Sequence, residues 1–325
     1  MDPSTELPKS TLLNTWLTSL GYEVIGAEHL VGDVSPRRYF RLDLGGGKTA
    51  ILAYYPSDLE ETCTRFEITT KLLEDLAVPV PAILGANCAA GFMLLEDLGA
   101  STLYDRRGED WYSLVPYFEQ SISLWRRIRS LPLQTALDLN PALDRDLLVA
   151  ELRQTWEIYL TPRQLTGSPD ESRLLWQALT EVCEQLSNEP QVVCHRDFMA
   201  RNLVPMGPSC KVGVLDHQDL RAGPSFYDLA SLLNDSLFPP PETENALLAS
   251  CLSDESERLS YHRAAVQRTI KVVGTFEAFA RRGNPARLPL IPPTLGRALY
   301  HLQRVPEGKG IAQTLSELWR PILGA

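Results

Sequence analysis

The strongest structural signal in the chain lies in VVCHRDFMARNLV, residues 192–204, and VGVLDHQDL, residues 212–220. Each stretch opens with apolar residues typical of a strand and continues into polar residues typical of a loop. Asp197 follows the first apolar run, Asn202 comes five residues later, and Asp216 closes the second run. Phosphoryl transfer needs a carboxylate that orients the acceptor hydroxyl, together with carboxylate and amide oxygens that hold Mg²⁺ against the phosphates. The residue types and their spacing suit that chemistry.

Short apolar segments separated by turns precede these stretches. YFRLDL, GGG and KTAILAYY, at residues 39–55, predict a hairpin with a glycine turn. Residues 58–77 have the periodicity of an amphipathic helix, and GFMLLEDLG at residues 91–99 predicts a strand that runs into a polar break. We therefore expect residues 1–99 to form a small lobe made of a sheet and a helix.

Helical periodicity dominates after residue 100. The expected helices span residues 109–130, 142–160, 170–187, 242–256, 258–282 and 310–322. Two short strands, at residues 191–194 and 212–216, interrupt this pattern and are expected to pair, and LPLIPP at residues 288–293 is expected to be a loop. The fold class is therefore α+β, with a larger and mainly helical lobe at residues 100–325.

Composition restricts the class of protein. The 325 residues include 31 Lys and Arg against 41 Asp and Glu, so the net charge is 31 − 41 = −10, which argues against a nucleic-acid partner. Apolar residues at 44% and charged residues at 22% are ordinary for a globular protein. The six cysteines include no C-x-x-C pair, and neither a signal peptide nor an apolar span long enough for a membrane is visible. We expect a reduced, cytoplasmic protein with no membrane partner, for which a monomer is plausible.

Several motifs resemble known families. H-R-D-x-x-x-x-N followed by D-x-x-D resembles the catalytic and metal-binding loops of protein-kinase-like folds. D-F-M-A-R-N, LDHQD and GPSFYDLASLL are more similar to the aminoglycoside phosphotransferase superfamily. Within it, SPRRYFRL, LLEDLG and QRTIKVVGTFEAFARR are most similar to the N-acetylmuramate/N-acetylglucosamine 1-kinases of cell-wall recycling. The resemblance implies a two-lobed kinase-like fold, ATP and Mg²⁺ as cofactors, and an amino sugar phosphorylated on its anomeric hydroxyl.

The resemblance also implies roles for individual residues. Asp197 would be the catalytic base, and Asn202 and Asp216 would be the Mg²⁺ ligands. The first lobe would hold the nucleotide. Its phosphate-contacting candidates are Ser35, Arg37 and Arg38, and its hinge candidates beside the adenine are Leu95, Glu96 and Leu98.

The acceptor site is less clearly marked. Arg268 and Lys271 are three residues apart on one predicted helix, and a basic pair suits the lactyl carboxylate of N-acetylmuramate, although such pairs are more often solvated. Arg201 and Asp219 are further candidates for contact with substrate, and Arg201 could instead pair with an acid. Asp228 lies in an apolar run, where a hydrogen bond to the catalytic loop would offset the cost of its burial.

Structural roles are expected for two histidines, and one residue typical of related kinases is missing. His195 should pack inside the catalytic loop, and His217 should pack beside the metal site. The third strand, TAILAYY, has Ala53 or Tyr54 where related kinases carry a lysine. Either arginines of the first lobe replace this lysine, or ATP binds differently.

Three alternatives remain open. The same chemistry could act on another acceptor, such as an aminoglycoside, an amino alcohol or a different sugar. The chain could be a non-catalytic binding module of kinase shape, as the missing lysine would allow. It could also be a metal hydrolase that uses the side chains of His195, Asp197, Asp216 and His217.

Overall fold

The computed structural model describes residues 7, 11–30, 36–207 and 209–324, and these residues form two compact units. The first unit comprises the described residues of Met1–Ser101 together with Val204–Gln218. The second comprises Thr102–Leu203 and the described residues of Asp219–Ala325. The segment Val204–Gln218 therefore packs as part of the first unit, although the sequence analysis assigned it to the lobe that begins at residue 100.

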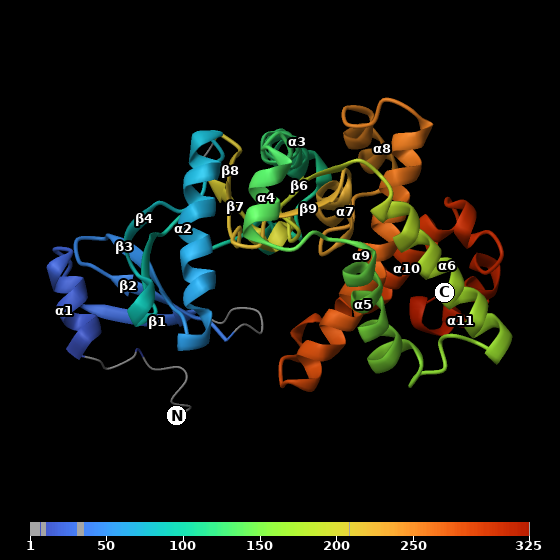
Figure 1. Cartoon of the computed structure of the whole chain (residues 1–325), viewed down its shortest axis with the longest axis horizontal. Helices are drawn as coiled ribbons and strands as arrows, with labels where there is room; N and C mark the ends of the chain where they lie inside the picture. The colour runs from blue at the N-terminus through green and yellow to red at the C-terminus, as the bar shows by residue number, and fades with distance from the viewer. Residues whose placement is uncertain (1–6, 8–10, 31–35, 208, 325) are drawn as a thin grey trace. The chain divides into compact units, whose positions relative to one another are not determined.

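A five-stranded antiparallel sheet forms the centre of the first unit, in the order β1-β2-β3-β5-β4 (Figure 1). Its strands are β1 (Gly26–Leu30), β2 (Arg38–Asp43), β3 (Thr49–Tyr54), β4 (Ile83–Asn87) and β5 (Phe92–Glu96). The predicted hairpin is confirmed: Arg38 lies opposite Tyr54, and Asp43 lies opposite Thr49. The turn between them contains three glycines with positive φ, which only glycine adopts without strain.

Helices α1 (Thr11–Ser19) and α2 (Glu60–Asp75) pack on opposite faces of this sheet (Figure 1). Successive strand residues point to opposite faces. Leu94 of β5 accordingly belongs to the apolar cluster that includes residues of α1, whereas Leu95 belongs to the cluster that includes residues of α2. The amphipathic helix expected at residues 58–77 is confirmed, preceded by the short 3-10 turn η2 (Ser57–Leu59).

One pair of cysteines corrects the expectation of a fully reduced chain. Cys63 on α2 and Cys88 in the 3-10 turn η3 (Cys88–Ala90) form a disulfide, with 5.5 Å between their Cα atoms. The two residues are 25 positions apart in the sequence. Their proximity depends on α2 packing over the β4–β5 connection, which no spacing rule for cysteines reveals. Cys183, Cys194, Cys210 and Cys251 are free.

A separate two-stranded sheet lies in sequence between the loop that carries Asn202 and the loop that carries Asp216. It consists of β7 (Leu203–Met206) and β8 (Lys211–Val214), and the N–H of Val214 donates to the carbonyl of Pro79 at 2.7 Å. A Cβ on Gly213 would come within 2.6 Å of Leu98 Cδ1 and 3.0 Å of Met206 Sδ, so both side chains would have to move to admit one. This close packing brings β8 against the hinge segment of the first unit.

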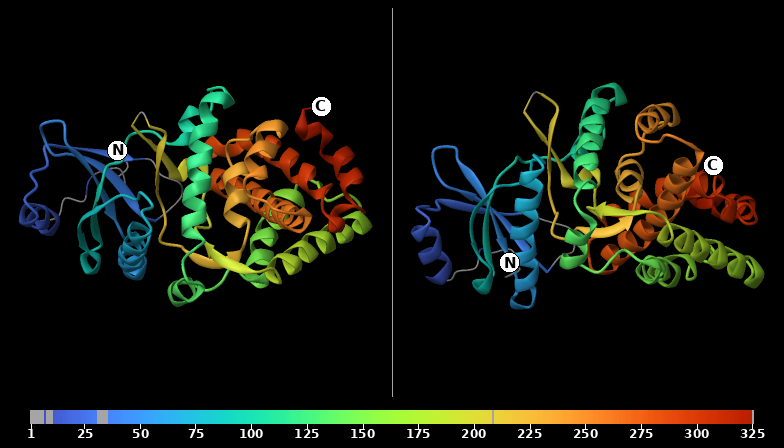
Figure 2. Two further views of the ribbon diagram at one scale, coloured as in Figure 1. Left: turned by 90° about the horizontal axis from the view of Figure 1, so that it is seen from above. Right: turned by 45° about the horizontal axis from the view of Figure 1, so that its top comes forward.

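The second unit is mainly helical, and its long helix α9 contacts α5, α6, α7 and α10 (Figures 1 and 2). Its helices are α3 (Trp111–Ile128), α4 (Leu133–Leu139), α5 (Arg145–Thr155), α6 (Pro169–Ser187), α7 (Tyr227–Asn234), α8 (Pro241–Ala249), α9 (Glu255–Arg281), α10 (Ile291–Leu302) and α11 (Ala312–Leu323). A π-helical turn at Trp156–Leu160 continues α5. Within the described part of the chain, no helix is both long and apolar enough to cross a membrane.

Three sequence expectations for this unit are wrong. The helix expected at residues 242–256 ends at Ala249, and α9 begins at Glu255. Strand β6 (Gln191–Cys194) pairs with β9 (Arg221–Pro224), not with the strand near residue 212. Residues 288–293 are not all loop, because α10 begins at Ile291. Its prolines occupy the first turn, where a missing N–H removes no helical hydrogen bond.

Helices α5 and α9 cross at close range. Thr155 Oγ1 donates to the carbonyl of Ile270 at 2.8 Å and accepts from the N–H of Gly274 at 3.1 Å. A Cβ on Gly274 would come within 2.2 Å of Thr155 Oγ1, so only glycine allows this approach. The crossing brings Glu151 of α5 beside Lys271 of α9.

Candidate active site

The loop that joins β6 to β7 carries Asp197, and its backbone is held by a buried carboxylate. Asp228 of α7 accepts hydrogen bonds from the N–H groups of His195 at 2.6 Å and Arg196 at 2.8 Å. Arg196 has a φ of 74°, a left-handed conformation that is uncommon outside glycine. The two bonds offset the cost of this conformation and of burying the carboxylate. The predicted structural role of Asp228 is confirmed.

His195 packs inside the same loop, as predicted. Its side chain is fully buried, and its ring lies edge-on to Phe198 with 5.8 Å between ring centroids.

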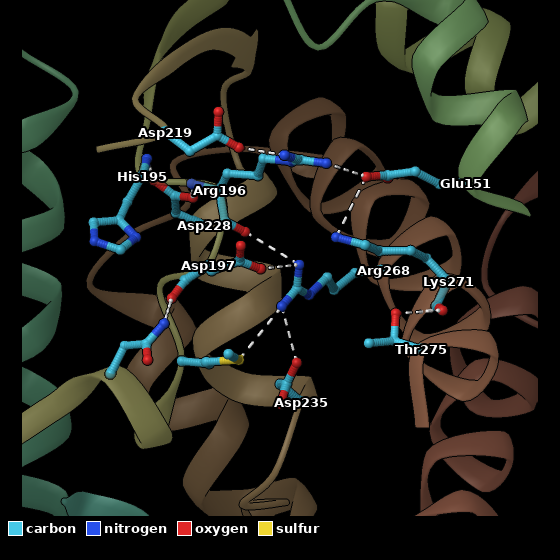
Figure 3. Close-up of polar contacts among 12 residues, drawn as sticks. Glu151, His195, Arg196, Asp197, Asp219, Asp228, Asp235, Arg268, Lys271 and Thr275 are labelled. Carbon is cyan, nitrogen blue, oxygen red and sulfur yellow. Dashed lines mark hydrogen bonds and ion pairs between the residues drawn. The ribbon is translucent and has the colours of Figure 1, made fainter. Parts of the chain in front are cut away.

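Arg268 of α9 is the central cation of this region, and only 2% of its side chain is exposed (Figure 3). Nη1 donates to Asp197 Oδ1 at 3.0 Å and to the carbonyl of Arg196 at 3.1 Å. Nη2 donates to Asp235 Oδ2 at 2.9 Å. Asp197 itself keeps 31% of its side chain exposed. The guanidinium therefore fixes one side of the Asp197 carboxylate while the carboxylate stays accessible.

The charge state of Asp197 follows from its neighbours. Burial opposes ionisation, but the positive charges of Lys271, Arg268 and Arg196 outweigh it and hold the pKa of Asp197 well below its usual range. An ionised carboxylate can accept a proton from a hydroxyl, which a protonated one cannot.

A second group of ion pairs lies beside Asp197 (Figure 3). Arg196 pairs with Glu151 at 2.7 Å and also with Asp219, and Glu151 pairs with Lys271 at 3.4 Å. Sequence reasoning did not identify Glu151 as a member of this group, because its position on α5 becomes relevant only through the α5–α9 crossing. The acceptor contacts predicted for Asp219 and Lys271 remain predictions.

Arg201 pairs with an acid, one of the two roles considered from the sequence. Its Nη2 lies 2.7 Å from Asp235 Oδ1, and its Nη1 donates to Ser236. Asp235 is fully buried. It links Arg201 to Arg268, because it pairs with both guanidinium groups. Asp235 lies directly after the buried helix α7, where a carboxylate needs a partner.

Asn202 ends the 3-10 turn η6 (Ala200–Asn202). Its side-chain Nδ2 donates to the carbonyl of Asp197 at 2.9 Å. This bond fixes which end of the amide is nitrogen, so the side-chain oxygen is directed elsewhere. One hydrogen bond thus links Asn202, the predicted metal ligand, to the backbone of Asp197, the predicted base.

In the first unit, Asp216 follows β8 with a φ of 60°, again in the left-handed region. Its Oδ1 accepts from Arg37 Nη2 and from Gln218 Nε2, each at 2.9 Å. The side chain of Asp216 is 35% exposed and that of Arg37 is 12% exposed. Arg37 lies immediately before β2. Its guanidinium pairs with Asp216, the predicted metal ligand.

His217 is buried, as predicted from the sequence. Its Nδ1 lies 2.8 Å from Thr69 Oγ1, and its ring lies 4.2 Å from that of Phe66, measured between centroids. Both partners belong to α2, so this helix packs directly against the residue that follows Asp216.

Ser35 and Arg38 are the other residues predicted to contact the nucleotide phosphates. Ser35 lies outside the described residues. The guanidinium of Arg38 lies over the ring of Tyr54, 4.6 Å from its centroid. On the third strand Ala53 lies opposite Tyr39, and β3 carries no lysine.

The hinge candidates lie at the end of β5. Leu95 is buried, and Leu98 packs against Gly213. The N–H of Glu96 donates to the carbonyl of Ala82 at 2.8 Å, and its carboxylate accepts from the N–H of Ala82 at 3.2 Å. A contact of these residues with adenine remains a prediction.

The donor set suits the predicted metal. Mg²⁺ prefers oxygen ligands and usually takes only one or two from the protein, keeping water and phosphate oxygens for the rest. Asn202 carries an amide oxygen and Asp216 carries a carboxylate, and both are ligand types that Mg²⁺ accepts. Among the residues that the structure describes, no cluster of three or more His, Cys, Asp or Glu side chains could hold a metal ion.

Comparisons with known proteins agree on a kinase-like protein. An N-acetylmuramate/N-acetylglucosamine kinase of Pseudomonas putida is 30% identical over 301 residues, which cover 88% of this chain and 86% of the relative. A protein of the same name from Pseudomonas aeruginosa is 29% identical over 332 residues, which cover 94% of this chain and 96% of the relative.

A solved structure confirms the predicted two-lobed kinase-like fold. The choline kinase LicA of Streptococcus pneumoniae matches with a TM-score of 0.62 at 16% sequence identity, over 93% of this chain and 98% of that one. The sequence profile of the phosphotransferase enzyme family matches residues 27–265. The chain belongs to the phosphotransferase enzyme family.

Proposed function

We propose that this phosphotransferase transfers the γ-phosphoryl group of ATP to the anomeric hydroxyl of N-acetylmuramate or N-acetylglucosamine, with Mg²⁺ as the metal. The observation that carries this proposal is the similarity, over most of the chain, to relatives named as kinases of these two sugars.

Asp197 is the catalytic base of the proposed reaction. Its carboxylate accepts the proton of the sugar hydroxyl, the hydroxyl oxygen forms a bond to the γ-phosphorus, and the bond from that phosphorus to the bridging oxygen of ADP breaks. An anomeric hydroxyl is more acidic than the other hydroxyls of a sugar, so the proton need move only late in the reaction. The three cations around Asp197 keep the carboxylate ionised, so it can accept a hydrogen bond from the hydroxyl and orient it; because they also make it a weaker base, they fit a proton transfer that comes late.

Asn202 and Asp216 hold the metal in this proposal, and Arg37 contacts the phosphates. A bound Mg²⁺ supplies positive charge to the phosphate oxygens as the bond to the leaving group breaks. The Asn202 amide is oriented by its bond to the Asp197 carbonyl, and Asp216 is oriented by Arg37 and Gln218. Arg37 supplies a cation in a unit whose third strand carries no lysine.

The proposal is tested by measuring ADP release from MgATP with a panel of acceptors. The panel contains N-acetylmuramate, N-acetylglucosamine, glucose, kanamycin and choline, with an acceptor-free control. Any sugar phosphate is then heated in dilute acid, because an anomeric phosphate ester hydrolyses far more readily than a phosphate at another position.

Turnover restricted to the two amino sugars, with an acid-labile product, is the expected result. Replacement of the base, Asp197→Asn, should lower kcat by about 10²- to 10⁴-fold, the usual contribution of a general base. Turnover on kanamycin or choline alone would refute the proposed acceptor. A variant within a few-fold of the parent enzyme would refute Asp197 as the base.

A further inference from the structure

We propose that Arg268 is a positioning residue for phosphoryl transfer: anchored by Asp235, it holds the carboxylate of Asp197 in the orientation that receives the acceptor's proton. The inference rests on the proposed function only in taking Asp197 as the base. It assigns Arg268 a different role from the acceptor contact suggested by the sequence.

The geometry of the guanidinium group supports this role. Nη1 bonds both to Asp197 Oδ1 and to the carbonyl of Arg196, so one nitrogen fixes the side chain of the base and the backbone just before it. Nη2 bonds to Asp235. The guanidinium group is planar and rigid, so anchoring one nitrogen sets the position of the other. Rotation of the Asp197 carboxylate would therefore break a charge-assisted hydrogen bond.

The anchor at Asp235 is itself fixed. Asp235 is the C-terminal capping residue of α7, is fully buried, and also pairs with Arg201 at 2.7 Å. The same helix carries Asp228, which holds the N–H groups of the loop. Helix α7 thus positions the loop twice, through Asp228 at the backbone and through Asp235 and Arg268 at the side chain of the base.

Burial argues against a direct contact between Arg268 and a sugar. Only 2% of its side chain is exposed, and both terminal nitrogens already bond to groups of the protein. Buried ion pairs commonly add little net stability compared with apolar residues of the same size. The arrangement is therefore better explained by the geometry it imposes on Asp197 than by its contribution to folding.

The first test compares Arg268→Gln with a matched control on the same helix. Arg263 of α9 is also largely buried, pairs with Glu307 at 2.7 Å and lies 3.7 Å from Glu189, and is unrelated to the catalytic loop. Both Arg268→Gln and Arg263→Gln should lower Tm. At a temperature well below both Tm values, only Arg268→Gln should lower kcat, by about 10- to 100-fold, because small displacements of a catalytic group have effects of this size.

The Michaelis constants separate positioning from substrate contact. Arg268→Gln should leave KM for ATP and for the sugar within about threefold of the parent values, as expected for an interaction that acts in the transition state. Arg268→Lys should recover part of the lost kcat, since lysine keeps the charge but cannot bridge two carboxylates with a planar fork. A rise in sugar KM at unchanged kcat would overturn the proposal and favour an acceptor contact.

A second test asks whether Arg268 acts through Asp197. In the Asp197→Asn background, assayed at high enzyme concentration over hours, Arg268→Gln should change kcat by less than about threefold, because the residue has lost its target. An equal loss of kcat in both backgrounds would overturn the proposal, as would an Arg268→Gln enzyme with parental kcat. Full activity of Asp197→Asn alone would instead refute the proposed base.

Discussion

Each unit of the molecule pairs an arginine with an aspartate assigned to phosphoryl transfer, but the two arginines are held differently. Arg268 is almost completely buried and bonds to the carboxylates of Asp197 and Asp235. Arg37 bonds to Asp216, whose side chain is about one-third exposed. Asp197 and Asp216 are exposed to similar extents, 31% and 35% of the side chain, so the difference lies in Asp235, the buried second carboxylate that anchors Arg268.

This difference in burial separates two functions of the same residue type. A guanidinium group between two carboxylates, one of them deeply buried, cannot leave without exposing an unpaired charge to the protein interior, which is strongly destabilising. The Arg37–Asp216 pair is partly exposed, and breaking a partly exposed pair costs less than breaking a fully buried one. Arg268 is therefore suited to hold a group in place, and Arg37 is suited to bind a ligand phosphate.

The largest expected effect concerns the exposed pair. Asp216→Asn should lower kcat by about 10³-fold at saturating ATP, because a metal ligand supports several kcal/mol of charge stabilisation in the transition state. Part of the activity should return at high Mg²⁺, since a weakened site is refilled by mass action. Titration of turnover against Mg²⁺ measures this. Parental activity with an unchanged Mg²⁺ dependence would show that Asp216 is not a metal ligand.

The second prediction concerns a pH effect on the unit that contains Arg268. His262 lies on α9 with Nδ1 2.9 Å from Nδ1 of His301. Burial, together with the charges of Arg304, Arg258 and Arg297, lowers the pKa of His262 to about 4. The unfolded chain binds a proton near pH 6.5, whereas the folded chain does so only near pH 4. Stability should therefore be complete above pH 6.5 and should fall as the pH drops toward 4.

The expected contribution of His262 to the loss is about 3 kcal/mol of unfolding free energy, the equivalent of a shift from 6.5 to about 4. Burial also lowers the pKa of His301, which adds a loss of the same sign. Five of the six tryptophans belong to the second unit, so urea unfolding followed by tryptophan fluorescence reports mainly on that unit. His262→Gln, which keeps a hydrogen-bonding side chain but does not titrate, should reduce this pH dependence. An equal pH dependence in the parent and the variant would contradict the assignment.

The chemistry of the site could be predicted from the sequence better than its architecture. Asp197, Asn202 and Asp216 stand at fixed distances from predicted strands, so their spacing and the family resemblance together mark them as candidates. The partners of these residues come from distant segments. Glu151 reaches the site only because a glycine in α9 allows α5 to approach closely, and the position of Asp235 depends on how α7 ends.

The errors have the same physical origin. The strand at residues 191–194 was expected to pair with the strand near residue 212, but it pairs with β9, since strand pairing is decided by tertiary packing. The disulfide between Cys63 and Cys88 also joins segments that meet only when α2 packs on the sheet. Local patterns predict the residue types of a site and the elements around it, but not the long-range partners that position them.

The smallest expected effect tests the comparison most directly. If Arg37 can exchange Asp216 for a phosphate, Arg37→Gln should raise KM for ATP by about 10- to 30-fold, the value of one charge-assisted hydrogen bond. Its effect on kcat should be smaller, the reverse of Arg268→Gln. The matched control is Arg38→Gln: the guanidinium of Arg38 lies over the ring of Tyr54, and its loss should leave KM for ATP nearly unchanged.

The two Michaelis constants and the two values of kcat then decide between the roles. A raised KM with preserved kcat at Arg37, together with a lowered kcat and preserved KM at Arg268, would show that a buried anchoring carboxylate such as Asp235 distinguishes a positioning arginine from a ligand-binding one. If Arg37→Gln instead lowers kcat at constant KM, Arg37 positions Asp216 as Arg268 positions Asp197. The missing lysine of β3 would then have to be replaced by another cation.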